Sequence, residues 1–155
     1  MGKSTQNAAE EFPEQLKLAN QVCFPLYSAS NAVVRAYKPY LDKLDITYLQ
    51  YIVLMVLWEE GSLNVKEIGN RLFLNSGTLT PLLKRLDAKG LVKRSRSGKD
   101  ERARIISLTE EGKELRSMAE SIPGELVCSL GLEKEKLLHV KALCEGILKA
   151  LDTDE

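Results

Sequence analysis

The most constraining feature of this chain is the order of signals in residues 64–108, which predicts a helix, a short turn, a second helix and a two-stranded basic ribbon. The first helix is expected to begin after Asn64, because Asn64 and Glu67, three residues later, can form a capping box. Its buried positions are expected to be Val65, Ile68 and Leu72, which recur at helical spacing. A helix-turn-helix followed by a hairpin is a winged helix, so this segment is expected to lie on duplex DNA.

The second helix is predicted to follow a turn at residues 74–77. Its apolar positions are four leucines at helical spacing, Leu79, Leu82, Leu83 and Leu86. Gly90 is expected to stop this helix. Residues 91–96 and 102–108 are strand-like, and the charged residues 97–101 between them suit a hairpin tip. The predicted fold class is therefore mainly α with a small β-wing, a winged helix-turn-helix.

The net charge is zero, with 22 basic and 22 acidic residues, but the charges are segregated along the chain. Residues 84–104 hold nine Lys or Arg against three Asp or Glu, a balance of +6, whereas residues 110–155 hold six against eleven, a balance of −5. A charged run is usually only a solvated face. Here the basic run coincides with the second predicted helix and the ribbon, where a phosphate backbone would lie. We therefore favour contact with DNA.

Candidate DNA contacts come from both parts of this segment. On the second helix they are the polar and basic side chains away from the leucines, namely Ser76, Thr78, Thr80, Lys84 and Arg85. In the ribbon they are the basic side chains Arg94, Arg96, Lys99, Arg102 and Arg104. The three hydroxyl residues are alternatively helix caps, and the charges at the ribbon tip are alternatively solvated. A recognition helix, however, reads bases and phosphates from its N-terminal end.

Three segments are predicted: a helical dimerisation and sensing segment at 1–45, the winged helix-turn-helix at 46–110 and a helical dimerisation segment at 111–155. Apolar residues recur at helical spacing over residues 12–43, where Pro25 and Pro39 are expected to break or kink the helix. A capping box at residues 47–50 predicts the start of a helix over 48–59. That helix is apolar nearly all round, so it is expected to be the buried centre of the domain.

Two further helices are predicted near residues 110–121 and 133–151, separated by Pro123 and Gly124. The last helix carries an apolar stripe at three- and four-residue steps, Leu137, Val140, Leu143, Cys144, Ile147 and Leu151. The small winged lobe cannot bury such a stripe, so the two chain ends are expected to pack together and against a second copy, forming the helical dimerisation lobe of an obligate twofold homodimer. Two recognition helices related by that axis read an inverted-repeat operator. The alternative is a monomer whose termini cover its own core.

Composition excludes several other classes of protein. No apolar run is long enough to cross a membrane and residues 1–11 lack a secretory signal, so a cytoplasmic location is expected. Neither a Gly-rich phosphate loop nor a metal-binding cluster is visible, so no cofactor and no metal are expected. The only histidine, His139, is interpreted as a helix-surface residue. The three cysteines, Cys23, Cys128 and Cys144, are too far apart for a local zinc motif, and they are not expected to form a permanent disulfide framework in a reducing compartment.

Several runs of residues resemble the MarR family of bacterial regulators, and the resemblance spans nearly the whole chain. The family-wide runs are 72–86 across the turn and second helix, 100–102 at the ribbon tip and 106–112 after it. Within that family, residues 21–30, 37–44 and 46–48 are similar to the OhrR branch of organic hydroperoxide sensors. The resemblance implies a dimeric transcriptional repressor, not an enzyme, that leaves its operator when an organic hydroperoxide oxidises it.

The same resemblance implies that Cys23 is the reactive cysteine, held near Tyr37 and Tyr48 of the facing subunit. A thiolate is the nucleophile that attacks a peroxide O–O bond, and two phenols can stabilise it by hydrogen bonds. Pro25 can also begin a helix, which would put Cys23 close to a partly positive helix end. Oxidation gives a sulfenic acid, which a second thiol condenses to a disulfide. Cys128, on a connection expected to move, resembles the resolving cysteine of the two-cysteine branch, in which the disulfide joins subunits.

Each of these residues also has a plainer interpretation. Alone, Cys23 would be a buried apolar residue, and the two tyrosines would be core aromatics with satisfied hydroxyls. Cys144 lies on the apolar stripe and is interpreted as core packing. The MarR resemblance implies that Asp100 braces the wing and that Arg102 reaches the minor groove, although both are alternatively solvated charges.

Three functions remain open from the sequence. The first is a repressor of organic hydroperoxide resistance genes, switched by oxidation of Cys23. The second is a MarR-type regulator released by a small non-oxidising ligand, with the cysteines incidental. The third is a thiol peroxidase, which the basic wing argues against because a peroxidase does not need it.

Overall fold

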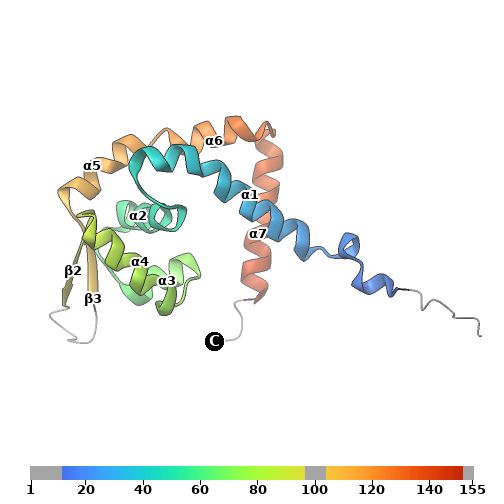
Figure 1. Cartoon of the computed structure of the whole chain (residues 1–155), viewed down its shortest axis with the longest axis horizontal. Coiled ribbons are helices and arrows are strands. Elements are labelled where there is room, and N and C mark those ends of the chain that lie inside the picture. Colours follow the sequence, from blue (N-terminus) through green and yellow to red (C-terminus); the bar gives the residue numbers. More distant parts are fainter. Residues whose placement is uncertain (1–11, 97–103, 152–155) are drawn as a thin grey trace, which may run out of the picture. The chain divides into compact units, whose positions relative to one another are not determined.

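The computed structural model describes residues 12–96 and 104–151, and Figure 1 shows the order of their helices and strands. The chain divides into two compact units, with the boundary between Ala36 and Tyr37. The first unit holds two single 3-10 turns, η1 (Glu14–Leu16) and η2 (Leu18–Asn20), and the beginning of α1. All the other helices and the sheet belong to the second unit. The three predicted segments, 1–45, 46–110 and 111–155, stay a prediction.

Helix α1 (Cys23–Leu41) begins later than the sequence predicts. Apolar spacing extends back to Phe12, but residues 12–22 form only the two 3-10 turns and irregular backbone. Pro25 lies in the first turn of α1, as expected for a residue that lacks an N–H and has a helical φ. Pro39 lies inside α1 near its end, and the chain continues into η3 (Asp42–Leu44).

Helix α2 (Tyr48–Glu60) is the buried centre of the second unit, as predicted. The expected capping box is present, because the backbone N–H of Thr47 donates to Gln50 Oε1 at 2.9 Å and Thr47 Oγ1 accepts from Gln50 N. Six of its residues are buried: Gln50, Tyr51, Val53, Leu54, Val56 and Leu57. Leu49 and Met55 are exceptions to the all-round apolar core, with 38% and 42% of their surfaces exposed.

Helices α3 (Val65–Leu72) and α4 (Ser76–Ala88) form the predicted helix-turn-helix. Asn64 and Glu67 make the expected capping box, in which Glu67 N donates to Asn64 Oδ1 at 2.9 Å. The N-cap of α4 is Asn75, whose Oδ1 accepts from Thr78 N at 2.9 Å. None of the three hydroxyl residues of the predicted recognition helix is therefore its N-cap. The four predicted leucines of α4 are all buried.

The wing has three strands where the sequence predicts two. Strands β2 (Val92–Arg96) and β3 (Arg104–Leu108) form the expected antiparallel hairpin, whose tip at residues 97–103 lies outside the described residues. The third strand, β1 (Leu63–Asn64), pairs with the other edge of β3, in the order β1-β3-β2. Two residues are too few to show strand alternation in a sequence, and Asn64 also caps α3.

Three helices follow the wing: α5 (Glu110–Ala119), α6 (Ile122–Leu130) and α7 (Lys134–Leu151). The sequence interpretation missed α6, because it treated Pro123 and Gly124 as a break. Proline is tolerated in a first helical turn, and Ile122 and Leu126 are buried on this short helix. Cys128 therefore lies in the last turn of a helix and not on the movable connection that the sequence predicts.

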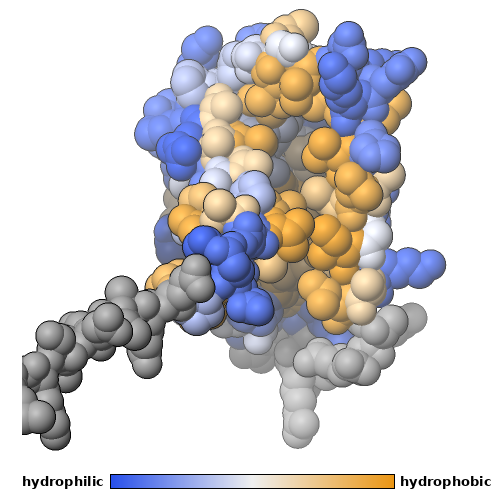
Figure 2. Space-filling view, turned by 90° about the vertical axis from the view of Figure 1, so that its right-hand side faces the viewer, coloured by the Kyte–Doolittle hydropathy of each residue, from blue (hydrophilic) through white to orange (hydrophobic). Residues whose placement is uncertain are grey.

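Helix α7 has no buried residue within the described chain. Of its predicted stripe, Val140, Leu143 and Ile147 expose 52%, 56% and 43% of their surfaces. Figure 2 views the molecule from the right-hand side of Figure 1 and shows hydrophobic side chains gathered at the surface. Cys144, predicted to pack in a core, is half-buried, and His139 is exposed as expected. None of the described helices is long and apolar enough to span a membrane.

Candidate DNA interface and cysteine sites

The face of α4 opposite its buried leucines carries the predicted contact residues. Ser76, Thr78, Thr80, Lys84 and Arg85 are all exposed. Lys84 and Arg85 follow Thr80 and Pro81 by four residues each, so they project on the same outer side of the helix. Within residues 12–96 and 104–151, neither cation takes part in an ion pair, so both charges are available to a phosphate.

Some of the predicted basic contacts of the wing lie on the described strands, and others lie at the tip, outside the described residues. Arg94 is half-buried on β2 and Arg104 is exposed on β3, and the strand register pairs Arg96 with Arg104. Lys99, Asp100 and Arg102 lie outside the described residues, so their predicted contacts and the predicted bracing of the wing stay predictions.

The structure brings Tyr37 and Tyr48 together. Tyr37 lies in the last part of α1, Tyr48 is the first residue of α2, and their ring centroids are 5.0 Å apart. Tyr51, one helical turn after Tyr48, is the third member of this cluster, with its ring centroid 5.8 Å from that of Tyr37. The sequence indicates only a buried apolar helix over residues 48–59 and does not single out Tyr51. Its spacing of three residues from Tyr48 was the available signal, because residues i and i+3 share a helix face.

The cluster keeps its phenols protonated. Burial raises the pKa of Tyr37 from 10.0 to about 12, with further contributions from the neighbouring Tyr48 and Tyr51. Burial also raises the pKa of Tyr48, and burial together with Tyr48 raises that of Tyr51. A phenol whose anion is disfavoured stays an O–H donor at neutral pH. The cluster is therefore suited to donate hydrogen bonds to an anion.

The cysteines occupy two exposed positions and one half-buried position. Cys23 is the first residue of α1 and is exposed, which agrees with the predicted place near a helix N-terminus and not with a buried apolar residue. Cys128 is exposed on α6. Cys23 belongs to the first compact unit, whereas the tyrosines and Cys128 belong to the second.

The indole of Trp58 joins the tyrosine cluster to the base of the wing. Its ring lies 6.2 Å from that of Tyr51 in an edge-to-face arrangement, and its Nε1 donates to the backbone carbonyl of Gly112 at 2.8 Å. The sequence did not reveal this contact, because Trp58 and Gly112 are 54 residues apart. The only local hint was that Gly112 closes the family-like run 106–112.

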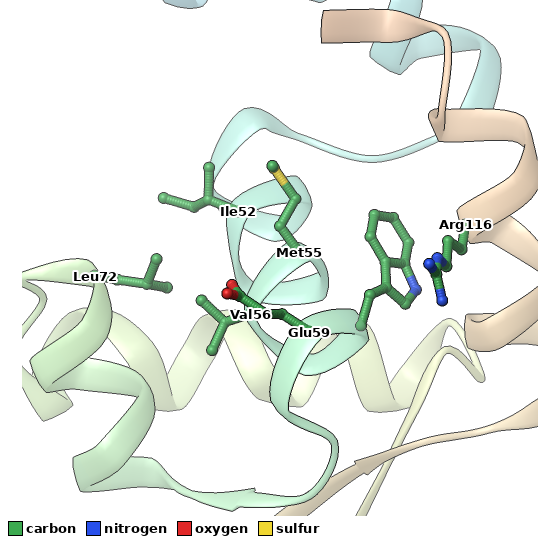
Figure 3. A pocket seen from close by; sticks show the side chains of 7 residues that line it. Ile52, Met55, Val56, Glu59, Leu72 and Arg116 are labelled. Atoms are coloured by element: carbon green, nitrogen blue, oxygen red, sulfur yellow. The ribbon is translucent and has the colours of Figure 1, made fainter. Parts of the chain in front are cut away.

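A pocket of about 540 Å³ opens beside α2. Its lining combines apolar residues with one acid and one base: Ile52, Met55, Val56, Trp58, Glu59, Leu72 and Arg116. Figure 3 shows Leu72 and Arg116 on opposite sides of it, with the α2 residues between them. Such a mixture is typical of a site for a small amphipathic molecule.

The capped helix pair, the exposed basic face of α4 and the three-stranded wing define a winged helix-turn-helix DNA-binding protein. A family model described as transcriptional regulator SarA/Rot matches residues 35–118. The organic hydroperoxide resistance transcriptional regulator of Bacillus subtilis strain 168 is 48% identical over 140 residues, which are 90% of this chain and 93% of that protein. The chain therefore belongs to the MarR/SarA family of transcriptional regulators, and it is not an enzyme.

Solved structures of a related regulator agree with this assignment. The structure of reduced AbfR bound to DNA, from a protein of Staphylococcus epidermidis, matches with a TM-score of 0.74 at 40% identity, covering 89% of this chain and 96% of that chain. The disulfide form of AbfR matches with a TM-score of 0.61 at 37% identity, covering 87% of this chain and 95% of that one.

Proposed function

We propose that this protein is a cytoplasmic, homodimeric repressor of organic hydroperoxide resistance genes that releases its operator when Cys23 is oxidised. The observation that carries the proposal is the Tyr37–Tyr48 pair, two half-buried phenols whose pKa values are raised, in a chain whose exposed Cys23 begins a helix. The name of the Bacillus subtilis relative and the existence of reduced and disulfide forms of AbfR support it.

The two tyrosines that serve Cys23 are proposed to come from the partner subunit. Cys23 and Tyr37 are fourteen positions apart on one helix, which corresponds to about 21 Å along its axis. A phenol must approach a sulfur to within hydrogen-bonding distance, so Tyr37 of the same helix is too far along the axis. A twofold dimer resolves this difficulty, because each Cys23 can then meet the tyrosine pair of the other copy.

The proposed reaction uses the thiolate of Cys23 as nucleophile. The thiolate sulfur attacks one oxygen of the O–O bond and becomes a sulfenic acid, and the other oxygen leaves with a proton as an alcohol. The thiolate of Cys128 from the other subunit then attacks the Cys23 sulfur. A disulfide forms and the sulfenic oxygen leaves as water. Formation of the bond requires an accessible second thiol, and Cys128 is exposed in the last turn of α6.

Oxidation of the Cys23 thiolate removes the anion to which the two tyrosine hydroxyls are proposed to donate hydrogen bonds. A hydrogen bond to a charged group contributes roughly 1.5 to 3 kcal/mol, so losing two of them outweighs the roughly 1.4 kcal/mol that corresponds to a tenfold change in affinity. Rearranging the dimer lobe then changes the spacing of the two recognition helices, and the inverted repeat is no longer matched.

The test of the proposal compares wild type with Cys23→Ser and Cys128→Ser in an operator-binding titration with and without one equivalent of an organic hydroperoxide. Wild type is expected to release DNA, and Cys23→Ser to stay bound because it has no thiolate to oxidise. Cys128→Ser is expected to be oxidised without an intersubunit disulfide, so a non-reducing gel shows only monomer bands. If peroxide releases the Cys23→Ser protein from DNA, the proposed redox switch at Cys23 is wrong. If Cys128→Ser still forms a covalent dimer, Cys128 is not the partner of Cys23 in the disulfide.

The proposed DNA contacts are tested through salt dependence. Each phosphate contact adds a released counterion, so log Kd changes with log salt concentration in proportion to the number of contacts. Arg85→Ala is expected to weaken operator binding and to reduce the salt slope by about one. Lys149→Ala, which removes an equal charge near the end of α7, is the matched control and is expected to keep the wild-type slope. Equal slopes for Arg85→Ala and wild type would exclude a phosphate contact at Arg85.

The pocket beside α2 favours a second candidate, a regulator released by a small non-oxidising ligand. Its apolar lining and its Glu59 and Arg116 side chains fit an amphipathic molecule. The peroxide titration separates the two candidates, because a ligand-released regulator with incidental cysteines keeps its DNA after oxidation. A peroxidase is no longer a candidate, since the family consists of transcriptional regulators.

A further inference from the structure

Four aromatic rings form an unbroken series inside the second compact unit. The ring of Tyr48 lies 5.0 Å from that of Tyr37, Tyr37 lies 5.8 Å from Tyr51, and Tyr51 lies 6.2 Å from Trp58. Three of the four belong to α2, at positions 48, 51 and 58, and steps of three and seven residues keep them on one side of that helix. The series therefore runs from the proposed sensing pair along almost the whole of α2.

The far end of the series is fixed to the base of the wing. Trp58 Nε1 donates to the carbonyl of Gly112 at 2.8 Å, and Gly112 N donates to Thr109 Oγ1 at 3.0 Å. Thr109 in turn donates its backbone N–H to the carbonyl of Leu91 at 3.2 Å and its hydroxyl to the carbonyl of Gly90 at 2.6 Å. Gly90 and Leu91 connect α4 to β2, so the hydrogen bonds of Thr109 hold the end of α4, the start of β2 and α5 together, and the Trp58 bond attaches α2 to them.

The series has little room to absorb a displacement at one end. Tyr51 exposes only 2% of its surface and packs in the core with Leu54 and Leu57. Close-packed interiors transmit a shift and do not deform smoothly, because every ring already touches its neighbours. A displaced Tyr37 or Tyr48 ring therefore has to displace Tyr51, and Tyr51 has to displace Trp58.

We propose that Tyr51 and Trp58 are positioning residues that couple the Tyr37–Tyr48 pair to the wing, through the ring contacts and the Trp58–Gly112 hydrogen bond. This inference rests on the proposed redox function and names the route by which oxidation at the sensing site reaches the DNA-binding surface. Neither residue touches the peroxide in this scheme. Their role is to make the position of Gly112, and with it the wing, depend on the position of the tyrosine pair.

The wild-type protein carries its own reporter for this inference, because Trp58 is the only tryptophan in the chain. Indole emission responds to the hydrogen bond and to the polarity around the ring. Addition of one equivalent of an organic hydroperoxide to the reduced, DNA-free dimer is expected to change the emission of Trp58 at the same rate at which Cys23 thiol disappears. The Cys23→Ser protein is expected to show no change under the same conditions.

A variant tests whether the hydrogen bond carries the coupling. Trp58→Phe keeps an aromatic ring against Tyr51 and removes the N–H that Gly112 accepts. It is expected to leave the rate of Cys23 oxidation and the Kd of the reduced protein for operator DNA within about twofold of wild type. The ratio of oxidised to reduced Kd is expected to fall by about fivefold, the factor that one hydrogen bond contributes. Met55→Leu, at an exposed position of the same helix, is the matched control and is expected to keep the wild-type ratio.

The outcomes separate this inference from the function on which it rests. If peroxide releases DNA while Trp58 emission stays constant, the route is wrong and the redox switch stands. An unchanged Kd ratio in Trp58→Phe also overturns the route. If peroxide neither consumes the Cys23 thiol nor releases DNA, the proposed function fails and the inference fails with it. Thermal unfolding of Trp58→Phe shows whether the variant is folded, and the emission of the unmodified protein decides the question where it is not.

Discussion

Replacing Gly112 with alanine is expected to lower the free energy of unfolding by about 3 kcal/mol or more, the upper range for overpacking in a close-packed interior. An ideal Cβ on Gly112 would lie 2.0 Å from the carbonyl oxygen of Leu91 and 3.0 Å from its carbonyl carbon. Both are backbone atoms, and Leu91 O already accepts from Thr109 N. The clash is therefore relieved only by moving α5 away from the start of β2, which breaks the network at the base of the wing.

The sign of this effect is decided by the contact and not by helix propensity. Alanine in the middle of a helix is favoured over glycine by about 1 kcal/mol, so a glycine with open space around it should gain stability on the same substitution. Gly146 lies inside α7 with no atom within 4 Å of an added Cβ, which makes Gly146→Ala the matched control. Urea unfolding of both variants measures the difference. Equal stability of Gly112→Ala and Gly146→Ala would contradict the close approach at Leu91.

The consequence of Gly112→Ala for DNA binding follows from the same geometry. The folded fraction is expected to bind operator DNA more weakly, because the wing and the end of α4 are both held at Gly112. Relative to wild type, hydrogen exchange is expected to accelerate more at the amides of β2 and β3 than at those of α2, since the clash acts at the wing and not at the centre of the core.

Local signals predicted the helix-turn-helix well. The capping boxes at Thr47 and Asn64 and the four leucines of α4 each act over three or four residues, and the physical cause of each lies in the residues themselves. The N-terminal apolar run was harder to interpret, because apolar spacing without caps does not show where a helix begins. Its start depends on Pro25, which the sequence offered both as a break and as a first-turn residue.

Long-range contacts explain what the sequence did not reveal. Strand β1 is a strand only because β3 is beside it, and α6 is a helix across Pro123 and Gly124 because Ile122 and Leu126 are buried. The candidate site also depends on contacts between residues that are far apart in the sequence. The pairing of Tyr37 with Tyr48 came from resemblance and not from their spacing. Trp58 lies 54 residues from its hydrogen-bond partner, so only the fold connects it to the wing.

Introducing a charge into the apolar stripe of α7 is expected to weaken operator binding by a factor of about 100 to 10,000, the range over which bivalent binding exceeds a single contact. Leu143 exposes 56% of its surface in the single chain, and α7 has no buried residue. In the proposed homodimer this stripe is covered by the second copy, where an unpaired carboxylate would be desolvated. Leu143→Asp is therefore expected to separate the subunits, and each monomer then holds only one half of the inverted repeat.

The control for this variant is the adjacent residue on the other side of the same helix. Ala142 is exposed and lies away from the stripe, so Ala142→Asp introduces the same side chain with the same helix propensity outside the proposed interface. Sedimentation or light scattering is expected to give a monomer for Leu143→Asp and a dimer for Ala142→Asp, and only the monomer is expected to lose the operator. A dimeric Leu143→Asp protein with wild-type affinity would mean that the stripe is not the dimer interface. Because the proposed sensing site takes Cys23 from one subunit and the tyrosines from the other, the monomer is also expected to lose the intersubunit disulfide while retaining the Cys23 thiol.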